Sequence, residues 1–172
     1  MKKNKILILG ASGFIGRNIA IFFSKKKNFS VTGTFLKKKI SIKNVKMLKC
    51  DLTKRKDTDK IIKGSDIIIQ AAATTSGAKD IIEKPYLHVN DNAIINSMVT
   101  RSAYDNKVKH IVVFSCSVMY QSSKNPVKET DFNPNSKIHP NYFGAACMKI
   151  FVEKMCAFYA SLGRNKYTLI RH

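Results

Sequence analysis

The stretch Gly10-Ala11-Ser12-Gly13-Phe14-Ile15-Gly16 determines the fold. It follows a short apolar run at residues 5–9 and precedes a segment, 14–26, whose apolar residues recur at helical spacing. Glycines at a strand-to-helix turn let the backbone bend tightly and approach a pyrophosphate, and the free amides of the helix N-terminus attract phosphate. The sequence therefore predicts a dinucleotide-binding loop whose contacts are Gly10, Ser12, Gly13, Phe14, Ile15 and Gly16.

Strand-like and helix-like patterns alternate along the rest of the chain. Strands are predicted at residues 5–9, 30–35, 45–50, 66–70, 110–115 and 167–170, and helices at 14–26, 53–63, 87–107 and 142–162. Because such alternation is typical of parallel sheets, we expect an α/β fold: a doubly wound parallel sheet of the Rossmann type in three layers. The polar stretch 121–141 is predicted to be a functional loop.

Composition excludes several classes of protein. The 172 residues are 44% hydrophobic and carry a net charge of +20, with 26 Lys and 5 Arg. Charge of this kind attracts nucleic acid, but no zinc-finger spacing or aromatic RNA-binding signature accompanies it, so we expect a solvated lysine-rich surface and no specific nucleic-acid partner. No apolar run approaches the roughly 20 residues of a membrane span, and no signal peptide is evident.

The four cysteines and four histidines show no metal-ligand spacing. Without a secretion signal, Cys50, Cys116, Cys147 and Cys156 are interpreted as free thiols. These observations predict a cytoplasmic protein without a metal site.

The glycine loop is one residue longer than the common Rossmann fingerprint. It resembles the loop of the short-chain dehydrogenase/reductase superfamily, and Gly13-Phe14-Ile15-Gly16 resembles that of its extended branch. Further resemblances follow in order along the chain. They are Asp51-Leu52 for adenine contact, Ala71-Ala72-Ala73 for the wall beside the adenosine ribose and phosphates, Asn90 at a helix start, the serine-rich stretch 114–120, and Lys149 with Glu153.

Within that branch, residues 71–77 and 89–92 look nearest to the sugar-nucleotide enzymes that resemble GDP-fucose synthase. The resemblance implies an NAD(P)-dependent epimerase, dehydratase or reductase that transfers hydride between the nicotinamide and a nucleotide-linked sugar. It covers the N-terminal Rossmann part of such enzymes, so residues 1–172 are expected to be the dinucleotide-binding domain and the C-terminal substrate domain to be absent from this chain.

The resemblance also implies a homodimer formed by the helices at 87–107 and 142–162. Each helix carries more apolar residues than one sheet face requires, although packing within the chain is an equally ordinary use of them. The candidate dimer residues are Met98, Phe151, Met155 and Phe158.

The end of the second predicted strand bears on the choice between NAD and NADP. An NAD enzyme is expected to place an acid there to hold the ribose hydroxyls, but the chain has Thr34-Phe35-Leu36. Lys37 follows with two further lysines and could face a 2′-phosphate. The sequence therefore favours NADP, and a solvated lysine run is the alternative.

The expected catalytic residues depart from the family pattern. The resemblance implies a tyrosine four residues before Lys149, where its pKa would be lowered by the lysine, but that residue is Ala145. Tyr142 is the nearest tyrosine, about 10 Å further along a helix axis. It is either the catalytic tyrosine or an aromatic residue that packs at the helix start. Lys149 is expected to bind the nicotinamide ribose, or else to pair with Glu153 on the helix surface.

The serine-rich stretch departs from the pattern as well. The position of the family's catalytic Ser or Thr, four residues before Tyr120, holds Cys116. A thiol is a weak hydrogen-bond donor, so Ser117 is the alternative working group, and Cys116 is not expected to be a nucleophile. Two functions therefore stay open: a nucleotide-sugar enzyme, or a catalytically impaired NADP(H)-binding module.

Overall fold

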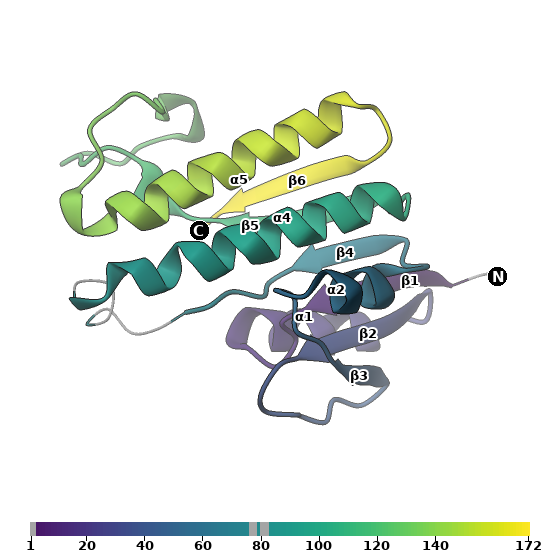
Figure 1. The fold of residues 1–172 in the computed structure, drawn as a ribbon. Coiled ribbons are helices and arrows are strands. Elements are labelled where there is room, and N and C mark those ends of the chain that lie inside the picture. Colours follow the sequence, from purple (N-terminus) through teal and green to yellow (C-terminus); the bar gives the residue numbers. More distant parts are fainter. Residues whose placement is uncertain (1–2, 76–78, 80–82) are drawn as a thin grey trace.

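The computed structural model describes residues 3–75, 79 and 83–172 (Figure 1). Its six strands form one parallel sheet in the order β3-β2-β1-β4-β5-β6. The strands are β1 (Asn4–Leu9), β2 (Phe29–Phe35), β3 (Val45–Lys49), β4 (Ile67–Gln70), β5 (His110–Ser115) and β6 (Lys166–Arg171). The order reverses direction between β1 and β4, which confirms the doubly wound Rossmann arrangement.

Helices cover both faces of the sheet. They are α1 (Phe14–Ser24), α2 (Arg55–Ile62), α4 (Asn90–Asp105) and α5 (Phe143–Ser161). In Figure 1, α1 lies behind the sheet, whereas α2, α4 and α5 lie in front of it. Alternation along β1 produces the two cores, because Ile6 and Ile8 pack on the α1 side while Leu7 and Leu9 pack with α4 and α5. The three layers are therefore confirmed.

Element boundaries differ from the predicted ones mainly at helix starts. The predicted helix at 87–107 begins as a 3₁₀ turn, η1 (Pro85–His88), and α4 proper starts at Asn90. The predicted helix at 53–63 also begins later: α2 starts at Arg55 with Lys54 as its N-cap, and the Thr53 hydroxyl donates to Asp51. The sequence stretch 71–77 that carried part of the resemblance runs into residues 76–78, which lie outside the described part of the chain.

The predicted loop at 121–141 is irregular apart from two short 3₁₀ turns, η3 (Glu129–Asp131) and the first residues of η4 (Pro140–Tyr142). A third turn, η2 (Ser117–Met119), directly follows β5. Within the described residues, no helix is both long enough and apolar enough to cross a lipid bilayer.

Candidate functional site

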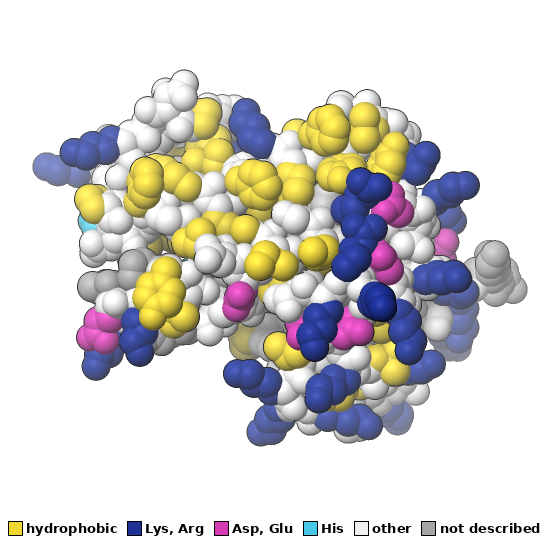
Figure 2. Space-filling model, in the orientation of Figure 1, with side chains coloured by type: hydrophobic (Ala, Val, Ile, Leu, Met, Phe, Trp, Pro, Cys, Tyr) yellow, Lys and Arg dark blue, Asp and Glu magenta, His cyan; other side chains and the backbone are white. Residues whose placement is uncertain are grey.

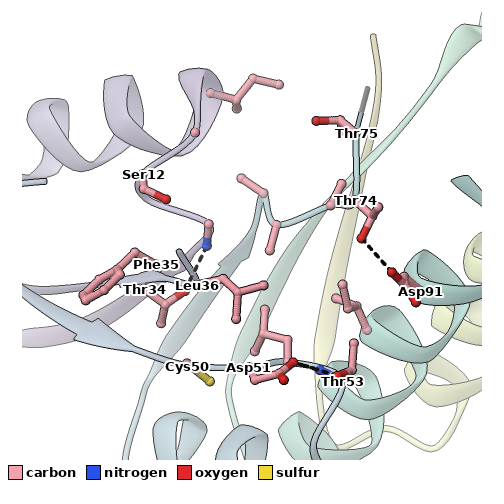
Figure 3. A pocket seen from close by; sticks show the side chains of 18 of the residues that line it. Ser12, Thr34, Phe35, Leu36, Cys50, Asp51, Thr53, Thr74, Thr75 and Asp91 are labelled. Atoms are coloured by element: carbon pink, nitrogen blue, oxygen red, sulfur yellow. Dashed lines mark hydrogen bonds between the residues drawn. The ribbon is translucent and has the colours of Figure 1, made fainter. Parts of the chain in front are cut away.

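Two adjoining cavities lie at the carboxyl ends of the strands, where ligands of open α/β sheets bind. The first, of about 610 Å³, is lined by the glycine loop and the ends of β2, β3 and β4 (Figure 3). The second, of about 350 Å³, extends toward β5 and α5. Both share Ile15 and residues 71–75, so together they form one elongated site.

Gly10 and Gly16 allow the loop to pack closely on the sheet. Gly10 has φ +77°, and a Cβ there would lie 2.6 Å from the Cα of Ala72. A Cβ at Gly16 would collide with the Gly10 carbonyl. A larger residue at either position would therefore displace backbone, so these two glycines are structural requirements of the loop.

Gly13 differs from its neighbours because packing does not require a glycine there. A Cβ at this position would meet a single nearby atom, the Gly10 carbonyl oxygen at 3.4 Å. Gly13 is exposed, lines the first cavity and is the N-cap of α1, with no side chain capping the helix. The first-turn amides of α1 therefore have no capping side chain, as a phosphate-binding helix start requires.

Thr34, at the end of β2, is buried and holds the glycine loop in place. Its hydroxyl accepts a hydrogen bond of 3.0 Å from the Gly10 amide (Figure 3). Sequence reasoning noticed Thr34 only as the absence of an acid. The position of a hydroxyl-bearing residue opposite the loop was the signal that it missed.

Asp51 and Leu52 follow β3 and both line the first cavity. The Asp51 carboxylate accepts hydrogen bonds from the Thr53 hydroxyl (2.6 Å) and the Thr53 amide (3.1 Å). The hydroxyl of Thr53, more than the Lys54 charge, lowers the pKa of Asp51. Asp51 is therefore a fixed carboxylate at the rim of the cavity, while Leu52 is buried.

Lys37 is exposed and does not belong to the lining of the first cavity, which ends at Leu36 on this side. The side chain of Leu36 points into the cavity where an acid was expected from NAD enzymes (Figure 3). Contact of Lys37 with a 2′-phosphate stays a prediction.

Asn92, rather than the predicted Asn90, joins α4 to the second cavity. Asn90 is exposed and outside both linings, whereas Asn92 is buried and lines the second cavity. The side chain of Asn92 accepts a hydrogen bond from the backbone amide of Thr74 (2.8 Å) and donates one to the backbone carbonyl of Thr74 (2.9 Å). It thereby fixes the chain that follows β4.

A buried polar chain continues from Asn92. Asn96 donates to the Asn92 carbonyl at 2.8 Å, and Gln70 donates to the Asn96 side chain at 3.3 Å. Gln70 also donates to the Ala72 carbonyl at 3.0 Å. Sequence reasoning missed these residues, although asparagines spaced by four, and therefore on one face of a helix, were an available signal.

Lys149 lies in the second cavity and donates a hydrogen bond of 2.6 Å to the Phe114 carbonyl at the end of β5. Burial lowers the pKa of Lys149, an effect that Cys116 and Glu153 partly offset. Among the described ion pairs, Glu153 pairs with Arg171, at 2.7 Å and 3.0 Å, and not with Lys149 as the alternative interpretation expected. Lys149 therefore keeps its ammonium group at the cavity.

Two of the other candidate catalytic residues differ in their access to this cavity. Cys116 lines it, and burial raises the pKa of the thiol, which opposes a nucleophilic thiolate. Ser117 is exposed and is not among the lining residues; its amide donates to the His172 carbonyl at 2.9 Å.

Ala145 lines the second cavity one helical turn before Lys149. Tyr142 belongs to η4, is 36% exposed, and packs its ring 5.6 Å from that of His139. It is not among the residues that line the second cavity in this conformation. The role of Tyr142 as catalytic tyrosine stays a prediction.

No group of three His, Cys, Asp or Glu side chains suited to a metal ion occurs in the described ranges. The four cysteines are free. The site thus consists of a glycine loop, a polar network and one half-buried lysine.

The sequence of the chain also matches a known protein family. The NAD dependent epimerase/dehydratase family matches residues 6–172, so the chain belongs to this family. A comparison with curated proteins finds no match.

Solved structures with the same fold include sugar-nucleotide enzymes. A UDP-Glc/GlcNAc 4-epimerase from Campylobacter jejuni has a TM-score of 0.83 at 17% identity, covering 98% of this chain and 53% of that one. A UDP-N-acetylglucosamine 4-epimerase from Methanobrevibacter ruminantium M1 has a TM-score of 0.77 at 24% identity, covering 99% and 55%.

A GDP-mannoheptose C4 reductase from Campylobacter jejuni, solved with NADP bound, has a TM-score of 0.82 at 19% identity, covering 99% and 51%. This chain therefore spans about half the length of the structures that it resembles. At these identities the similarity concerns the fold.

Proposed function

We propose that residues 1–172 form the dinucleotide-binding domain of an NAD(P)-dependent epimerase, dehydratase or reductase that acts on a nucleotide-linked sugar. The observation that supports this most is the continuous site of two cavities, with the glycine loop in one and Lys149 in the other. The family match supports an enzyme, and it does not support the alternative of an impaired binding module.

The residues present suit a dinucleotide. Gly13 leaves space beside the α1 amides for a pyrophosphate, and Asp51, Leu52 and Ala71-Ala72-Ala73 provide a pocket for the adenosine part. Lys149 supplies a cation and Gln70, Asn92 and Asn96 supply a rigid polar wall for the nicotinamide part. When bound, the nicotinamide supplies a hydride acceptor or donor.

NADP is proposed over NAD. The end of β2 presents Thr34, Phe35 and Leu36 to the first cavity, with no carboxylate to repel a 2′-phosphate, and Lys37 follows directly. Solved relatives of the fold contain either cofactor. Lys37→Glu is expected to weaken NADPH binding about tenfold and to change NADH binding less than twofold, which fluorescence titration would measure.

In the proposed mechanism Lys149 binds the nicotinamide ribose and Tyr142 transfers the proton. Ser117 or Cys116 donates a hydrogen bond to the reacting oxygen. For Tyr142 to act, η4 would have to turn its ring from His139 toward Lys149. Lys149 lies in α5 and Tyr142 in the turn before it, while Cys116 and Ser117 directly follow β5. All four residues therefore border the same end of the sheet.

The test follows NADPH absorbance with GDP- and UDP-linked keto-sugars. Lys149→Met and Tyr142→Phe are expected to lower turnover at least a hundredfold, because positioned proton transfer contributes about 10²–10⁴-fold. Ala145→Tyr, which restores the family spacing, is the matched control and should raise turnover. Unchanged turnover in Tyr142→Phe would remove Tyr142 from the mechanism. NADPH binding without turnover, even when the chain is joined to a sugar-binding domain, would favour the binding module.

A homodimer through α4 and α5 is proposed as well. Figure 2 shows hydrophobic side chains along both helices on the face turned to the viewer. Phe151 is 51% and Phe158 60% exposed. Light scattering should give the mass of a dimer, and Phe158→Glu should shift it to that of a monomer, because a charge would be buried at the interface. The free thiols fit a reducing, cytoplasmic location.

A further inference from the structure

Arg171, the last residue of β6, is a point where several separate segments meet. Its guanidinium donates to both carboxylate oxygens of Glu153 on α5, at 3.0 Å and 2.7 Å. It also donates to the Tyr120 hydroxyl at 2.9 Å and lies 4.5 Å from the centre of the Phe132 ring. Arg171 therefore has its orientation fixed from three sides.

Glu153 lies four residues after Lys149, so the two side chains are neighbours on one helix face and their charges suit an i, i+4 ion pair. Glu153 is 8% exposed and cannot leave its carboxylate unpaired at low cost. The bidentate bond to Arg171 engages both oxygens. Lys149 instead points to the second cavity and bonds to the Phe114 carbonyl at 2.6 Å.

We propose that Arg171 is a positioning residue that keeps Glu153 from pairing with Lys149, so that the Lys149 ammonium stays in the second cavity, where it bonds to the Phe114 carbonyl. This inference rests on the proposed function, in which that cavity receives the nicotinamide part of the cofactor. Without Arg171, Glu153 would pair with Lys149 and withdraw its charge from the cavity.

The charges around Lys149 determine how this can be measured. Cys116, His88 and His172 share its cavity, and Glu153 lies on its own helix. Burial lowers the pKa of Lys149, while Cys116 and Glu153 raise it. Loss of Arg171 alone should raise that pKa, because Glu153 becomes uncompensated. Loss of Glu153 alone should lower it, because Arg171 becomes uncompensated. Loss of both should restore it.

The experiment measures acetylation of Lys149 by acetic anhydride as a function of pH, followed by peptide mass spectrometry on the full chain. Below its pKa, the reactive amine fraction falls tenfold for each unit by which the pKa rises. At fixed pH we expect at least threefold slower labelling in Arg171→Met and at least threefold faster labelling in Glu153→Gln. The double variant should label within about twofold of the original chain.

Arg171→Lys keeps a charge but loses the bidentate bond, so it should slow labelling less than Arg171→Met does. If Arg171→Met does not fold, Arg171→Lys and Glu153→Gln still give the two opposite shifts. Equal labelling of Lys149 in both single variants, or shifts in the same direction, would overturn the inference, because a merely structural pair would not change Lys149 in opposite directions.

NADPH titration of the same variants separates this inference from the proposed function. Arg171→Met should bind NADPH at least threefold more weakly, and the double variant should recover. The acetylation rates could follow the expected pattern while neither the original chain nor any variant binds NADPH. In that case the proposed function fails and the positioning role of Arg171 stands.

Discussion

The hydroxyl of Thr34 accepts a hydrogen bond from the Gly10 amide across 3.0 Å, which ties the end of β2 to the glycine loop. Gly10 follows Leu9, the last residue of β1, so its amide lies beyond the strand and needs another acceptor. Thr34 supplies that acceptor from a position that is 2% exposed. The strand end that lacks an acid for the ribose thus has a different task, which is to hold the loop.

Thr34→Val removes this hydroxyl at nearly constant volume. The Gly10 amide is then left without its partner, which should cost about 1–3 kcal/mol of unfolding free energy. Urea unfolding would measure it. Thr34→Ser, which keeps the hydroxyl, is the matched control and should lose less. Equal loss in the two variants would show that the methyl packing matters and the hydrogen bond does not.

The glycine loop gives a second prediction, in which stability and binding separate. Gly16→Ala should unfold more easily, because its Cβ would collide with the Gly10 carbonyl. Gly13→Val should fold normally, because the position is open and exposed, but its side chain would occupy the space that a pyrophosphate needs. Calorimetry with NADPH would detect the loss. Unchanged NADPH binding in folded Gly13→Val would refute the placement of the pyrophosphate.

The acid stability of the protein should depend on Glu153. Burial alone would raise its pKa, but hydrogen bonds from Arg171 and Ser115 outweigh burial and the pKa lies below its ordinary value. A depressed folded-state pKa stabilises the protein above the ordinary value near 4.5, and this stabilisation is lost as the pH falls through the folded-state pKa.

Glu153→Gln should therefore be less stable at pH 7, by about 3 kcal/mol, since it leaves Arg171 without its charge partner. The difference from the original chain should shrink below pH 4. Urea midpoints at several pH values would show this, and a difference that does not change with pH would mean that the carboxylate charge is not the cause.

Sheet topology and the glycine loop could be predicted because local sequence determines both. Residues 110–115 form a nearly continuous apolar run, which is typical of a parallel strand, and in β5 they are fully buried on one face and partly buried on the other. Glycine placement between a strand and a helix has few other uses. Asn92 could not be preferred to Asn90 from the sequence, because its bond to Thr74 joins residues 18 apart.

Contacts between distant residues were also out of reach. The Thr34–Gly10 bond joins residues 24 apart and the Arg171–Glu153 pair residues 18 apart, and neither spacing has a periodic signature. Tyr142 illustrates the same limit, since its direction depends on η4 and His139 rather than on helical spacing from Lys149.

Lys149 should lower the stability of the ligand-free protein while it serves binding. Burial lowers its pKa more than Cys116 and Glu153 raise it, so the folded chain disfavours the ammonium form. This cost is full below the folded-state pKa and disappears as the pH rises to the ordinary value near 10.5, where the unfolded chain also becomes neutral. Lys149→Met removes the charge and keeps a flexible apolar chain of similar length.

We therefore expect Lys149→Met to be more stable than the original chain at pH 7, with the gain fading toward pH 10.5 in urea unfolding. NADPH affinity should fall at least tenfold, because hydrogen bonds to charged groups contribute about 1.5–3 kcal/mol. Lys154→Met, on an exposed position of the same helix, is the control and should change neither property. A Lys149→Met chain that is less stable at pH 7 would show that the bond to Phe114 outweighs the cost of burial, and unchanged NADPH affinity would remove Lys149 from the cofactor site.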